Sequence, residues 1–390
     1  MPNHLDLLVF NWQDRLHPQA GGAETNLHQV FGRLATRGHH VTVVASSWRG
    51  ALPHETLDGL EIHRCGNRIT YPIAARSFYR NALMQRSFDV VVEDLNKVPI
   101  ATPKWVREPV VLLVHHLFGS TAFDAASPFV AMATVLLERT LLPLYANCPI
   151  IAVSDSSARE VRERTHHDAA VHVIHNGVAQ DQAAIPHVED APANSNDALF
   201  VYVGRLQRYK RVDLPICALA QLTGDNIAAR LIIAGRGPEE HRLRKLAKEL
   251  GIGDRVEFRG FVSEPERITL MSRALANVMT SLKEGWGMSI LDAGVLGTPT
   301  IASDSPGLRD AIRHGQTGLL VPHGDVPALT LAMRTLATNR AGAERLGIAA
   351  RAYARHFTWE RAADAFEIVL EAAAVMRGQP ADDARRSPAR

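Results

Sequence analysis

The sequence of 390 residues has few cysteines and almost no excess of either charge. Its three cysteines, Cys65, Cys148 and Cys217, form no C-x-x-C pair and are too few for a disulfide framework, which favours a reducing, cytoplasmic setting. The 43 basic and 41 acidic residues leave a formal net charge of +2, so no overall field would recruit nucleic acid. Any anionic partner must therefore be recognised by a local patch of charge.

A long hydrophobic run and an export signal are also missing. The longest apolar region, residues 129–153, is interrupted by Glu138, Arg139 and two prolines, and it falls short of the roughly 20 apolar residues that span a bilayer. Residues 1–10 contain no basic segment and no small-residue cleavage site. We therefore expect no transmembrane helix, and we expect the first apolar run to be a strand.

The residues that are present have the composition of an ordinary globular protein. Apolar residues make up 46% of the chain and charged residues 22%, which excludes a disordered or collagen-like chain. At about 150 residues per domain, the length predicts two or three domains.

Short runs rich in β-branched residues and leucine recur along both halves of the chain. The runs are continuous and not alternating, as expected of parallel strands that are buried on both faces. A helical pattern over residues 24–37 follows the first run, and Gly38 ends it. The predicted strands are residues 5–10, 41–45, 90–93, 110–114 and 150–153 in the first half, and residues 200–203, 231–234, 256–258, 277–280, 300–303 and 318–321 in the second.

This alternation predicts two α/β domains joined by a linker. The apolar period fails in a stretch rich in Ala, Pro, Asn and Asp, and it restarts afterwards. The predicted segments are a first domain (1–180), a linker (181–197), a second domain (198–356), a final helix (357–377) and a polar, disordered tail (378–390). Because ligands of open α/β sheets bind at the carboxyl ends of the strands, functional residues should follow strands in both domains.

The segment Gly21-Gly22-Ala23-Glu24 follows the first predicted strand and opens the first helix. Paired glycines let backbone N–H groups approach a phosphate closely, and a helix N-terminus favours negative charge. A glycine pair suits a tight strand-to-helix turn equally well, so this segment alone leaves both interpretations open.

A second candidate segment follows the strand at residues 200–203. Gly204 ends that strand, and Arg205 and Lys210 then supply two cations that suit a diphosphate. A solvated basic loop would have the same composition. The position directly after a strand favours the functional interpretation.

A third candidate segment contains two carboxylates eight residues apart, Glu284 and Asp292. Between them, Gly285 and Gly287 lead from a strand into an apolar helix that begins near Met288. The carboxylates can hold hydroxyl groups while the loop amides meet phosphate or sugar oxygens. The alternative interpretation makes Glu284 a charge at a helix N-terminus and Asp292 a solvated residue.

These segments together resemble the family 4 retaining glycosyltransferases, the glycosyl transferases group 1. The family's E-x7-E motif is the most specific part, and here it has Asp292 in place of the second Glu. Shorter matches are Val203-Gly204-Arg205-Leu206 with Lys210, Gly235-Arg236-Gly237-Pro238, Phe258-Arg259-Gly260-Phe261-Val262-Ser263, His175-Asn176-Gly177-Val178 and the GG-x-E loop at 21–24. The resemblance implies a GT-B fold, with two Rossmann-like parallel-sheet domains facing a central cleft and a C-terminal helix that crosses back to the first domain.

The resemblance also implies roles for individual residues. Glu284 would contact the hydroxyls of the donor sugar and Asp292 the nucleotide ribose, while Arg205 and Lys210 would clamp the diphosphate. The remaining donor-side positions are Gly21, Gly22, Gly204, Gly235, Val262, Gly285, Gly287, Met288 and Ser289.

His115 and His116 follow the predicted strand at residues 110–114. A lone histidine there is most often structural, but the family has an active-site histidine at the end of this strand that touches the donor sugar. We favour His115, because the preceding apolar run aligns it better. Glu24 and Ser154 are candidates on the acceptor side, although Ser154 suits a helix N-cap equally well.

The implied reaction moves a sugar from a UDP-, GDP- or dTDP-sugar to a hydroxyl acceptor, with retention at the anomeric carbon. The acceptor would be a glycan, a lipid-linked sugar or a small molecule. The sequence has no D-x-D motif, so we expect no metal at the diphosphate and no cofactor. A catalytically silent nucleotide-sugar-binding protein and a GT-B sugar-nucleotide epimerase stay open as alternatives.

One segment of the first domain is basic and aromatic. Arg76, Phe78, Tyr79, Arg80 and Arg86 are typical of a helix that lies on an anionic membrane, here the inner leaflet. A solvated surface helix would have the same composition, so peripheral membrane contact is one of two interpretations.

Overall fold

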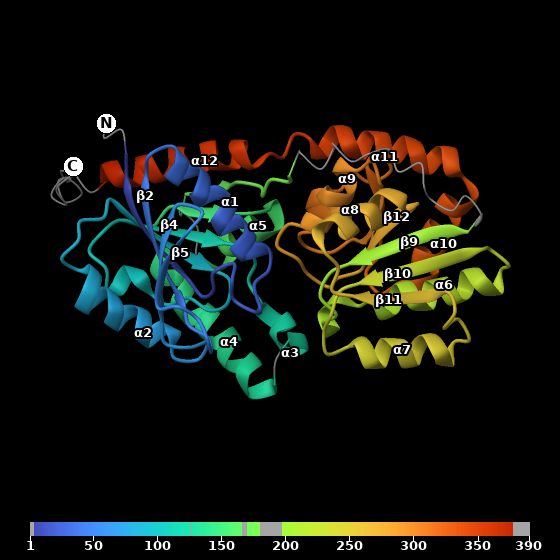
Figure 1. The fold of residues 1–390 in the computed structure, drawn as a ribbon, viewed down its shortest axis with the longest axis horizontal. Helices are drawn as coiled ribbons and strands as arrows, with labels where there is room; N and C mark the ends of the chain where they lie inside the picture. The colour runs from blue at the N-terminus through green and yellow to red at the C-terminus, as the bar shows by residue number, and fades with distance from the viewer. Residues whose placement is uncertain (1–3, 126, 166–169, 180–196, 377–390) are drawn as a thin grey trace, which may run out of the picture. The chain divides into compact units, whose positions relative to one another are not determined.

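The chain is described by a computed structural model, which covers residues 4–125, 127–165, 170–179 and 197–376. The predicted tail (378–390) and all of the predicted linker except Asp197 lie outside the described residues. The chain divides into two compact units, each with its own sheet (Figure 1). Unit 1 comprises Met1–Gly119, Met132–Gly177 and Trp359–Arg390, and unit 2 comprises Ser120–Ala131 and Val178–Thr358.

Unit 1 contains an eight-stranded sheet in the order β3-β4-β2-β1-β5-β6-β7-β8. The pairs are parallel except for β3 with β4. The central strands are buried on both faces, as their continuous Leu, Val and Ile runs predict. The strands are β1 (Asp6–Asn11), β2 (His40–Ser46), β3 (His54–Leu57), β4 (Leu60–Cys65), β5 (Val90–Leu95), β6 (Val110–Val114), β7 (Ile150–Ala152) and β8 (Val171–Val173).

Helices cover both faces of the unit 1 sheet (Figure 1). On one face, α2 and the short helices η1 and η4 contribute the buried Tyr71, Tyr79 and Tyr145 to the core that contains Leu8 and Phe10 of β1. Helix α5 contributes Val161 to the same core. The helices are α1 (Gly22–Thr36), α2 (Tyr71–Phe78), η1 (Tyr79–Leu83), η2 (Thr102–Lys104), η3 (Gly119–Thr121), α3 (Ala122–Ala125), α4 (Pro128–Leu141), η4 (Leu142–Tyr145), α5 (Asp155–Thr165) and α12 (Trp359–Met376), of which η3 after Gly119, α3 and the start of α4 are assigned to unit 2.

The final helix α12 belongs to unit 1, where it lies along α1 (Figure 1). Phe366 of α12 is fully buried, and its ring meets that of Phe31 edge-on at a centroid distance of 6.0 Å. Arg37 pairs with Glu360, Asp364 and Glu367 of α12 around this contact. Exposed ion pairs contribute little free energy, so the buried aromatic contact is the main anchor of this helix.

Unit 2 contains a six-stranded parallel sheet in the order β11-β10-β9-β12-β13-β14. Alternate residues of β9 point to opposite faces: Phe200 and Tyr202 join the core with α6, α7 and α10, and Val201 joins the cluster with α8 and α9. The elements are β9 (Ala198–Val203), η6 (Arg208–Lys210), α6 (Asp213–Gly224), β10 (Ala229–Ala234), α7 (Glu240–Glu249), β11 (Val256–Gly260), α8 (Glu264–Arg273), β12 (Ala276–Met279), α9 (Met288–Val295), β13 (Thr300–Ser303), η7 (Arg309–Ala311), β14 (Gly318–Val321), α10 (Val326–Thr338) and α11 (Arg340–Ala354).

The predicted fold class, two parallel-sheet α/β domains, is confirmed. The sequence missed three strands, β3, β4 and β8. The longest apolar region, which we expected to fall short of a membrane span, contains a helical segment, Pro128–Tyr145 in α4 and η4, that is long and apolar enough to cross a membrane by length and composition, and 22% of it is buried. Length and composition are weak support for a span, and Glu138 argues against one. Its buried carboxylate accepts the backbone N–H groups of Phe118 (2.6 Å) and Gly119 (2.9 Å), which ties α4 to the folded unit.

The aromatic residues of the predicted basic and aromatic helix do not lie on the surface. Tyr79 is buried in the core and Phe78 packs against the ring of His63, because these side chains face the sheet. Only the arginines of this segment, Arg76 and Arg80 in particular, face outward as expected. The predicted aromatic surface is therefore wrong, although the basic one is present.

Candidate active site

Polar side chains gather at the carboxyl ends of four neighbouring strands of unit 1. Asn11 ends β1, Asp94 lies near the end of β5, His115 follows β6, and Ser154 follows β7. These strands are neighbours in the order β1-β5-β6-β7. After β1 the chain adds strands on one side of β1, and from β5 onward it adds them on the other side, so the topological switch point lies between β1 and β5. Ligands of open α/β sheets bind at such a switch point.

His115 and Asp94 form the most buried part of this row. Nε2 of His115 lies 2.9 Å from Oδ1 of Asp94. The contact is an ion pair and is not aligned as a hydrogen bond, so Nε2 and both Asp94 oxygens lack a hydrogen-bond partner among the described residues. Buried polar atoms in this state are rare in folded proteins, and here they leave capacity for a ligand or water.

Burial alone would lower the pKa of His115, but the negative charges of Asp94 and Glu24 outweigh it and raise that pKa above 6.5. The backbone carbonyl of His115 accepts a hydrogen bond from Ser157 Oγ at 2.9 Å, which fixes the main chain at this point. His116 is less buried, and its ring packs against Phe118. Of the two histidines, His115 is therefore the one that joins the row.

Glu24 is used locally, to hold the loop before α1. Its Oε2 accepts the backbone N–H of Gly21 at 2.6 Å, and its Oε1 accepts a hydrogen bond from Asn96 at 2.9 Å. Burial raises the pKa of Glu24, while the hydrogen bond from Gly21 opposes the rise. The Gly21–Gly22 turn is thus fixed at the helix end, where the first amides of α1 have no partner within the helix.

Ser154 has the geometry of a helix N-cap. Its Oγ accepts the backbone N–H of Ser157 at 3.2 Å, three residues on, and lies 3.0 Å from Ser157 Oγ. Because Ser157 in turn donates to the His115 carbonyl, Ser154 acts on the row indirectly, by fixing the start of α5.

In unit 2, the loops after β9 and β10 are in direct backbone contact. A Cβ atom on Gly235 would lie 1.8 Å from the carbonyl oxygen of Gly204, and one on Gly237 would lie 2.2 Å from that of Leu206. Gly235 has a φ of 150°, which side-chain-bearing residues rarely adopt. Gly235 and Gly237 are therefore required for the close approach of these loops, which the sequence did not indicate.

A second close approach holds the loop that carries Glu284. The backbone N–H of Glu284 donates to the Pro306 carbonyl at 3.0 Å, and a Cβ on Gly307 would lie 2.1 Å from the Glu284 carbonyl oxygen. Gly287, with a φ of 62°, is the N-cap of α9. The first helical residues are Met288 and Ser289, and Ser289 Oγ donates to the Val203 carbonyl at the end of β9 at 3.4 Å.

Lys210 and Glu284, from motifs 74 positions apart, form an ion pair between Nζ and Oε1. Their side chains are only 11% and 16% exposed. Burial alone would lower the pKa of Lys210, but the charge of Glu284 outweighs it and raises that pKa, so the ammonium group stays charged. Lys210, which is predicted to bind the diphosphate, and Glu284, which is predicted to bind the sugar, are thus bound to each other in the protein without ligand.

Arg205 lies in the same loop as Lys210, and its side chain is exposed. Its backbone is fixed, because its carbonyl accepts a hydrogen bond from Tyr202 Oη at 2.9 Å. Its guanidinium has no ion pair within the described part of the chain. Arg205 is therefore available to an anionic ligand without breaking an existing contact.

Asp292 is not the solvated residue of the alternative interpretation. It lies in α9, where its Oδ2 is 2.8 Å from Nη1 of Arg267, which also pairs with Glu264. Burial raises the pKa of Asp292 to about 6, although Arg267 opposes the rise. The carboxylate is one methylene shorter than the glutamate of the family motif, and it is already engaged by an arginine.

The remaining predicted donor-side residues lie around these loops. Val262 follows β11, where it is half-buried beside the exposed Phe261, and the carbonyl of Gly260 accepts the Gly235 N–H at 2.7 Å. Gly285 lies in the Glu284 loop, next to the buried Trp286, whose ring meets that of Phe357 edge-on.

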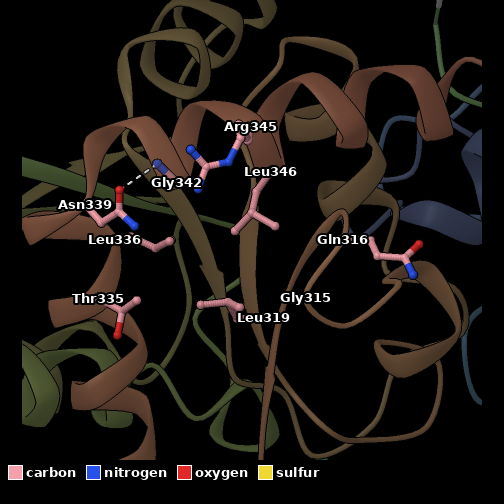
Figure 2. Close-up of a pocket in the computed structure, with 9 residues that line it drawn as sticks. All are labelled: Gly315, Gln316, Leu319, Thr335, Leu336, Asn339, Gly342, Arg345 and Leu346. Atoms are coloured by element: carbon pink, nitrogen blue, oxygen red, sulfur yellow. Dashed lines mark hydrogen bonds between the residues drawn. The ribbon is translucent and has the colours of Figure 1, made fainter.

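Unit 2 also has a hollow away from the strand ends, between α10, α11 and the turn before β14 (Figure 2). Leu319, Leu336 and Leu346 line it. Asn339 at its rim caps α11 by accepting the Gly342 N–H at 2.9 Å. None of the predicted site residues lines this hollow.

Comparison with known proteins places the whole architecture. The model for Glycosyltransferase Family 4 matches residues 20–182, and the model for Glycosyl transferases group 1 matches residues 186–353. The chain belongs to this glycosyltransferase family. A glycogen synthase from Mycobacterium tuberculosis is 34% identical over 213 residues, which cover 54% of this chain and 51% of the relative. The chain thus spans about half the length of the curated relative it matches.

Solved structures of glycosyltransferases share the fold. Sucrose-phosphate synthase from Thermosynechococcus elongatus superposes with a TM-score of 0.80 at 20% identity, covering 96% of this chain and all of that one. HepE from Anabaena, solved with UDP and glucose, superposes with a TM-score of 0.76 at 18% identity, covering 95% of this chain and all of that one. At these identities the likeness shows the fold alone, and it confirms the predicted GT-B architecture.

The structure adds residues that the sequence did not single out. Asp94 pairs with His115, Arg267 pairs with Asp292, and Gly307 supports Glu284. Asp94 could have been predicted from the sequence, because it lies at the end of a predicted strand next to the strand that His115 follows. Arg267 could not have been predicted, since it lies on a helix 25 positions before its partner Asp292 in the chain.

The raised pKa of His115 predicts a pH-dependent stability. A histidine whose folded pKa is raised contributes stability that is complete below pH 6.5 and is lost as pH rises through the folded pKa. We expect the difference in unfolding free energy between wild type and His115→Gln to be largest below pH 6.5 and to shrink above it, measured by chemical denaturation. An Asp94→Asn background should flatten this trend. A difference that is independent of pH in the wild-type background would contradict the assignment.

Proposed function

We propose that this protein is a retaining glycosyltransferase that moves a sugar from a nucleotide diphosphate sugar to an acceptor hydroxyl. The observation that carries the proposal is the Lys210–Glu284 ion pair, together with the exposed Arg205, which has no ion pair among the described residues and lies five positions before Lys210. It combines two cations for a diphosphate with one carboxylate for sugar hydroxyls at the carboxyl edge of a parallel sheet.

The donor would be held by the loops of unit 2. Arg205 and Lys210 would bind the diphosphate, Glu284 the sugar hydroxyls, and Asp292 the ribose. The bound UDP and glucose of the HepE structure support a UDP-sugar as the first donor to test, ahead of GDP- and dTDP-sugars. Asp292 is one methylene shorter than the family's glutamate, and its contact with the ribose would compete with its ion pair to Arg267.

The reaction breaks the bond between the anomeric carbon and the diphosphate. Negative charge grows on the leaving diphosphate, so cations that are already oriented stabilise the transition state more than the ground state. The sequence has no D-x-D motif, and two cations can neutralise this charge, so we propose that no metal ion acts at the diphosphate.

Unit 1 would supply the residues that face the reacting sugar and the acceptor. His115, held by Asp94 and with its pKa raised by that charge, is our candidate for contact with the donor sugar. Glu24 and Ser154 would act on this side through the backbone they fix: Glu24 through the Gly21–Gly22 turn and Ser154 through the start of α5.

The first experiment follows nucleotide release from UDP-, GDP- and dTDP-sugars, with and without cell extract as an acceptor source. We expect release from one donor, strengthened by extract and unchanged in chelator. Arg205→Ala should lower turnover about 10²–10³-fold, equivalent to about 2.7–4 kcal/mol, because it removes one of the two cations proposed to stabilise the leaving diphosphate. The matched control is Arg208→Ala, three positions on, which has a 72% exposed side chain.

Three outcomes decide between the alternatives. Binding without release would support a silent nucleotide-sugar-binding protein, and a changed sugar without an acceptor would support an epimerase. Wild-type turnover in Arg205→Ala would contradict the proposed diphosphate clamp.

We also propose that unit 1 contacts the cytoplasmic face of an anionic membrane through residues 69–80, which include α2 and the start of η1. Ile69 and Ile73 are 87% and 78% exposed, and Arg76 and Arg80 project outward beside them. Residues 66–88 contain no acidic side chain. Exposed apolar and basic residues in one segment favour an anionic interface. Three free cysteines support a cytoplasmic location.

Liposome co-sedimentation tests the membrane contact. We expect binding to vesicles that contain an anionic lipid and little binding to neutral ones. Arg76→Ala and Arg80→Ala should each weaken binding about fivefold, from about 1 kcal/mol per basic residue near the surface. The control is Arg345→Ala on α11 of unit 2, which should bind like wild type. Equal binding of both vesicle types, or of all three variants, would contradict the proposal.

A further inference from the structure

The β3–β4 hairpin at the edge of the unit 1 sheet brings together two histidines and a glutamate. His54 of β3 and His63 of β4 are direct cross-strand partners. Glu61 lies two residues before His63, so its side chain points to the same face of the hairpin. The turn at Asp58 and Gly59, whose φ angles are 52° and 78°, fixes this register.

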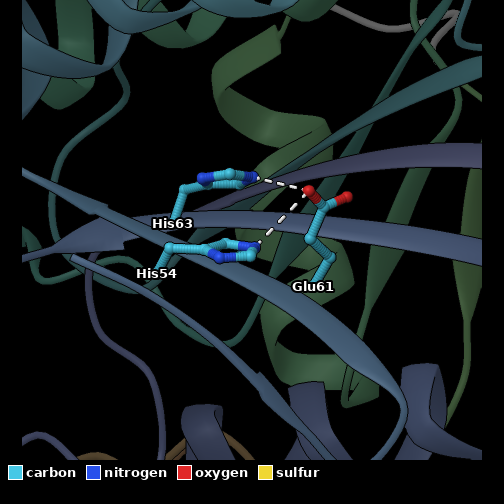
Figure 3. Close-up of side chains that lie close together, drawn as sticks. All are labelled: His54, Glu61 and His63. Carbon is cyan, nitrogen blue, oxygen red and sulfur yellow. Dashed lines mark hydrogen bonds and ion pairs between the residues drawn. The ribbon is translucent and has the colours of Figure 1, made fainter. Parts of the chain in front are cut away.

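The three side chains converge on one point (Figure 3). Oε1 of Glu61 lies 2.9 Å from Nε2 of His63 and 3.6 Å from Nε2 of His54. The two imidazole rings are stacked, with centroids 4.5 Å apart and planes 29° apart. One ligand atom from each residue lies within 4.8 Å of the other two.

These distances suit a small metal ion. A tetrahedral ion with ligand bonds of about 2.1 Å separates its ligand atoms by about 3.4 Å. The two observed nitrogen-to-oxygen separations, 2.9 and 3.6 Å, lie on either side of that value. Imidazole and carboxylate together suit zinc and similar divalent transition ions, whereas calcium and magnesium prefer oxygen ligands alone.

The surroundings of Glu61 orient it toward the histidines. Its other oxygen, Oε2, accepts hydrogen bonds from Thr42 Oγ1 at 2.9 Å and from Arg86 Nη1 at 3.0 Å. The ring of His63 packs against Phe78 at a centroid distance of 5.2 Å, which restricts its rotation. Partners of this kind orient metal ligands in proteins.

We propose that His54, Glu61 and His63 bind one divalent transition metal ion of the zinc type, with its remaining coordination positions open to water. The ion would cross-link β3 to β4, and β3 pairs with no other strand in the described part of the sheet. The site lies two strands away from β1 and shares no residue with the proposed donor and acceptor residues. The proposal is therefore independent of the proposed glycosyl transfer.

Metal titration of the full, untagged chain after chelator treatment tests this site. We expect calorimetry with Zn²⁺ to give one tight equivalent per chain, and Co²⁺ to give the visible absorption of tetrahedral coordination. Bound Zn²⁺ should also raise the thermal unfolding temperature. Because histidine ligands must be neutral, binding should be weaker at about pH 5.5 than at about pH 7.5.

Three variants locate the binding. His54→Ala, whose side chain is 53% exposed in the wild type, should fold normally and lose the tight equivalent. Thr42→Val, which removes a hydrogen bond to Glu61, should weaken binding at least about tenfold. The matched control is His241→Ala, an exposed histidine on α7 of unit 2, which should keep wild-type affinity.

The result that would overturn the proposal is equal Zn²⁺ affinity and stoichiometry in wild type, His54→Ala and His241→Ala, or the absence of a tight equivalent in wild type. Circular dichroism of each variant shows whether it is folded. If His54→Ala fails to fold, Glu61→Gln takes its place, since it keeps the side-chain shape and removes the charged ligand. Retention of the tight equivalent in Glu61→Gln would also overturn the proposal.

Discussion

The ion pair between Lys210 and Glu284 is the interaction on which the proposed chemistry depends. Two largely buried charges are tolerable only while each has a partner, because an unpaired buried charge costs several kcal/mol. The protein therefore fixes both backbones: Thr280 Oγ1 donates to the carbonyl of Arg211, next to Lys210, and Pro306 accepts the N–H of Glu284. A donor that binds both side chains replaces their ion pair with contacts to its diphosphate and its sugar hydroxyls, so neither side chain is left without a partner.

Close backbone approach makes this arrangement possible in unit 2. Gly235 lets the loop after β10 touch the loop after β9, and Gly307 lets the loop after β13 support Glu284. Both contacts lie at the carboxyl ends of parallel strands, on either side of the point between β9 and β12 where the strand order changes direction. Unit 1 uses the same topology differently, since its strand ends carry buried polar groups such as Asp94 and His115 in place of glycine contacts. The same architecture thus carries close glycine contacts at the strand ends of unit 2, where we propose that an anion binds, and buried polar groups at the strand ends of unit 1.

The sequence predicted most strands and the local motifs, but it missed the contacts between residues that are far apart in the chain. The ranges of β6, β13 and β14 are confirmed to the residue, because continuous apolar runs mark strands buried on both faces. The β3–β4 hairpin was missed because its residues are polar and alternate, although Asp58-Gly59 is a strong hairpin signal. Glu284 and Lys210 were each found from local motifs, but their mutual contact, like those of Asp292 with Arg267 and of Tyr79 with the core, depends on the tertiary fold.

The most direct test of the central claim is calorimetric titration of UDP into wild type, Lys210→Met and Glu284→Gln. If Glu284 holds Lys210 ready for the diphosphate, removing its charge frees the ammonium group, so Glu284→Gln should bind UDP at least as tightly as wild type. Lys210→Met should bind UDP about tenfold or more weakly, because it loses a charge-assisted contact. Equal loss of UDP affinity in both variants, or wild-type affinity in Lys210→Met, would contradict the account.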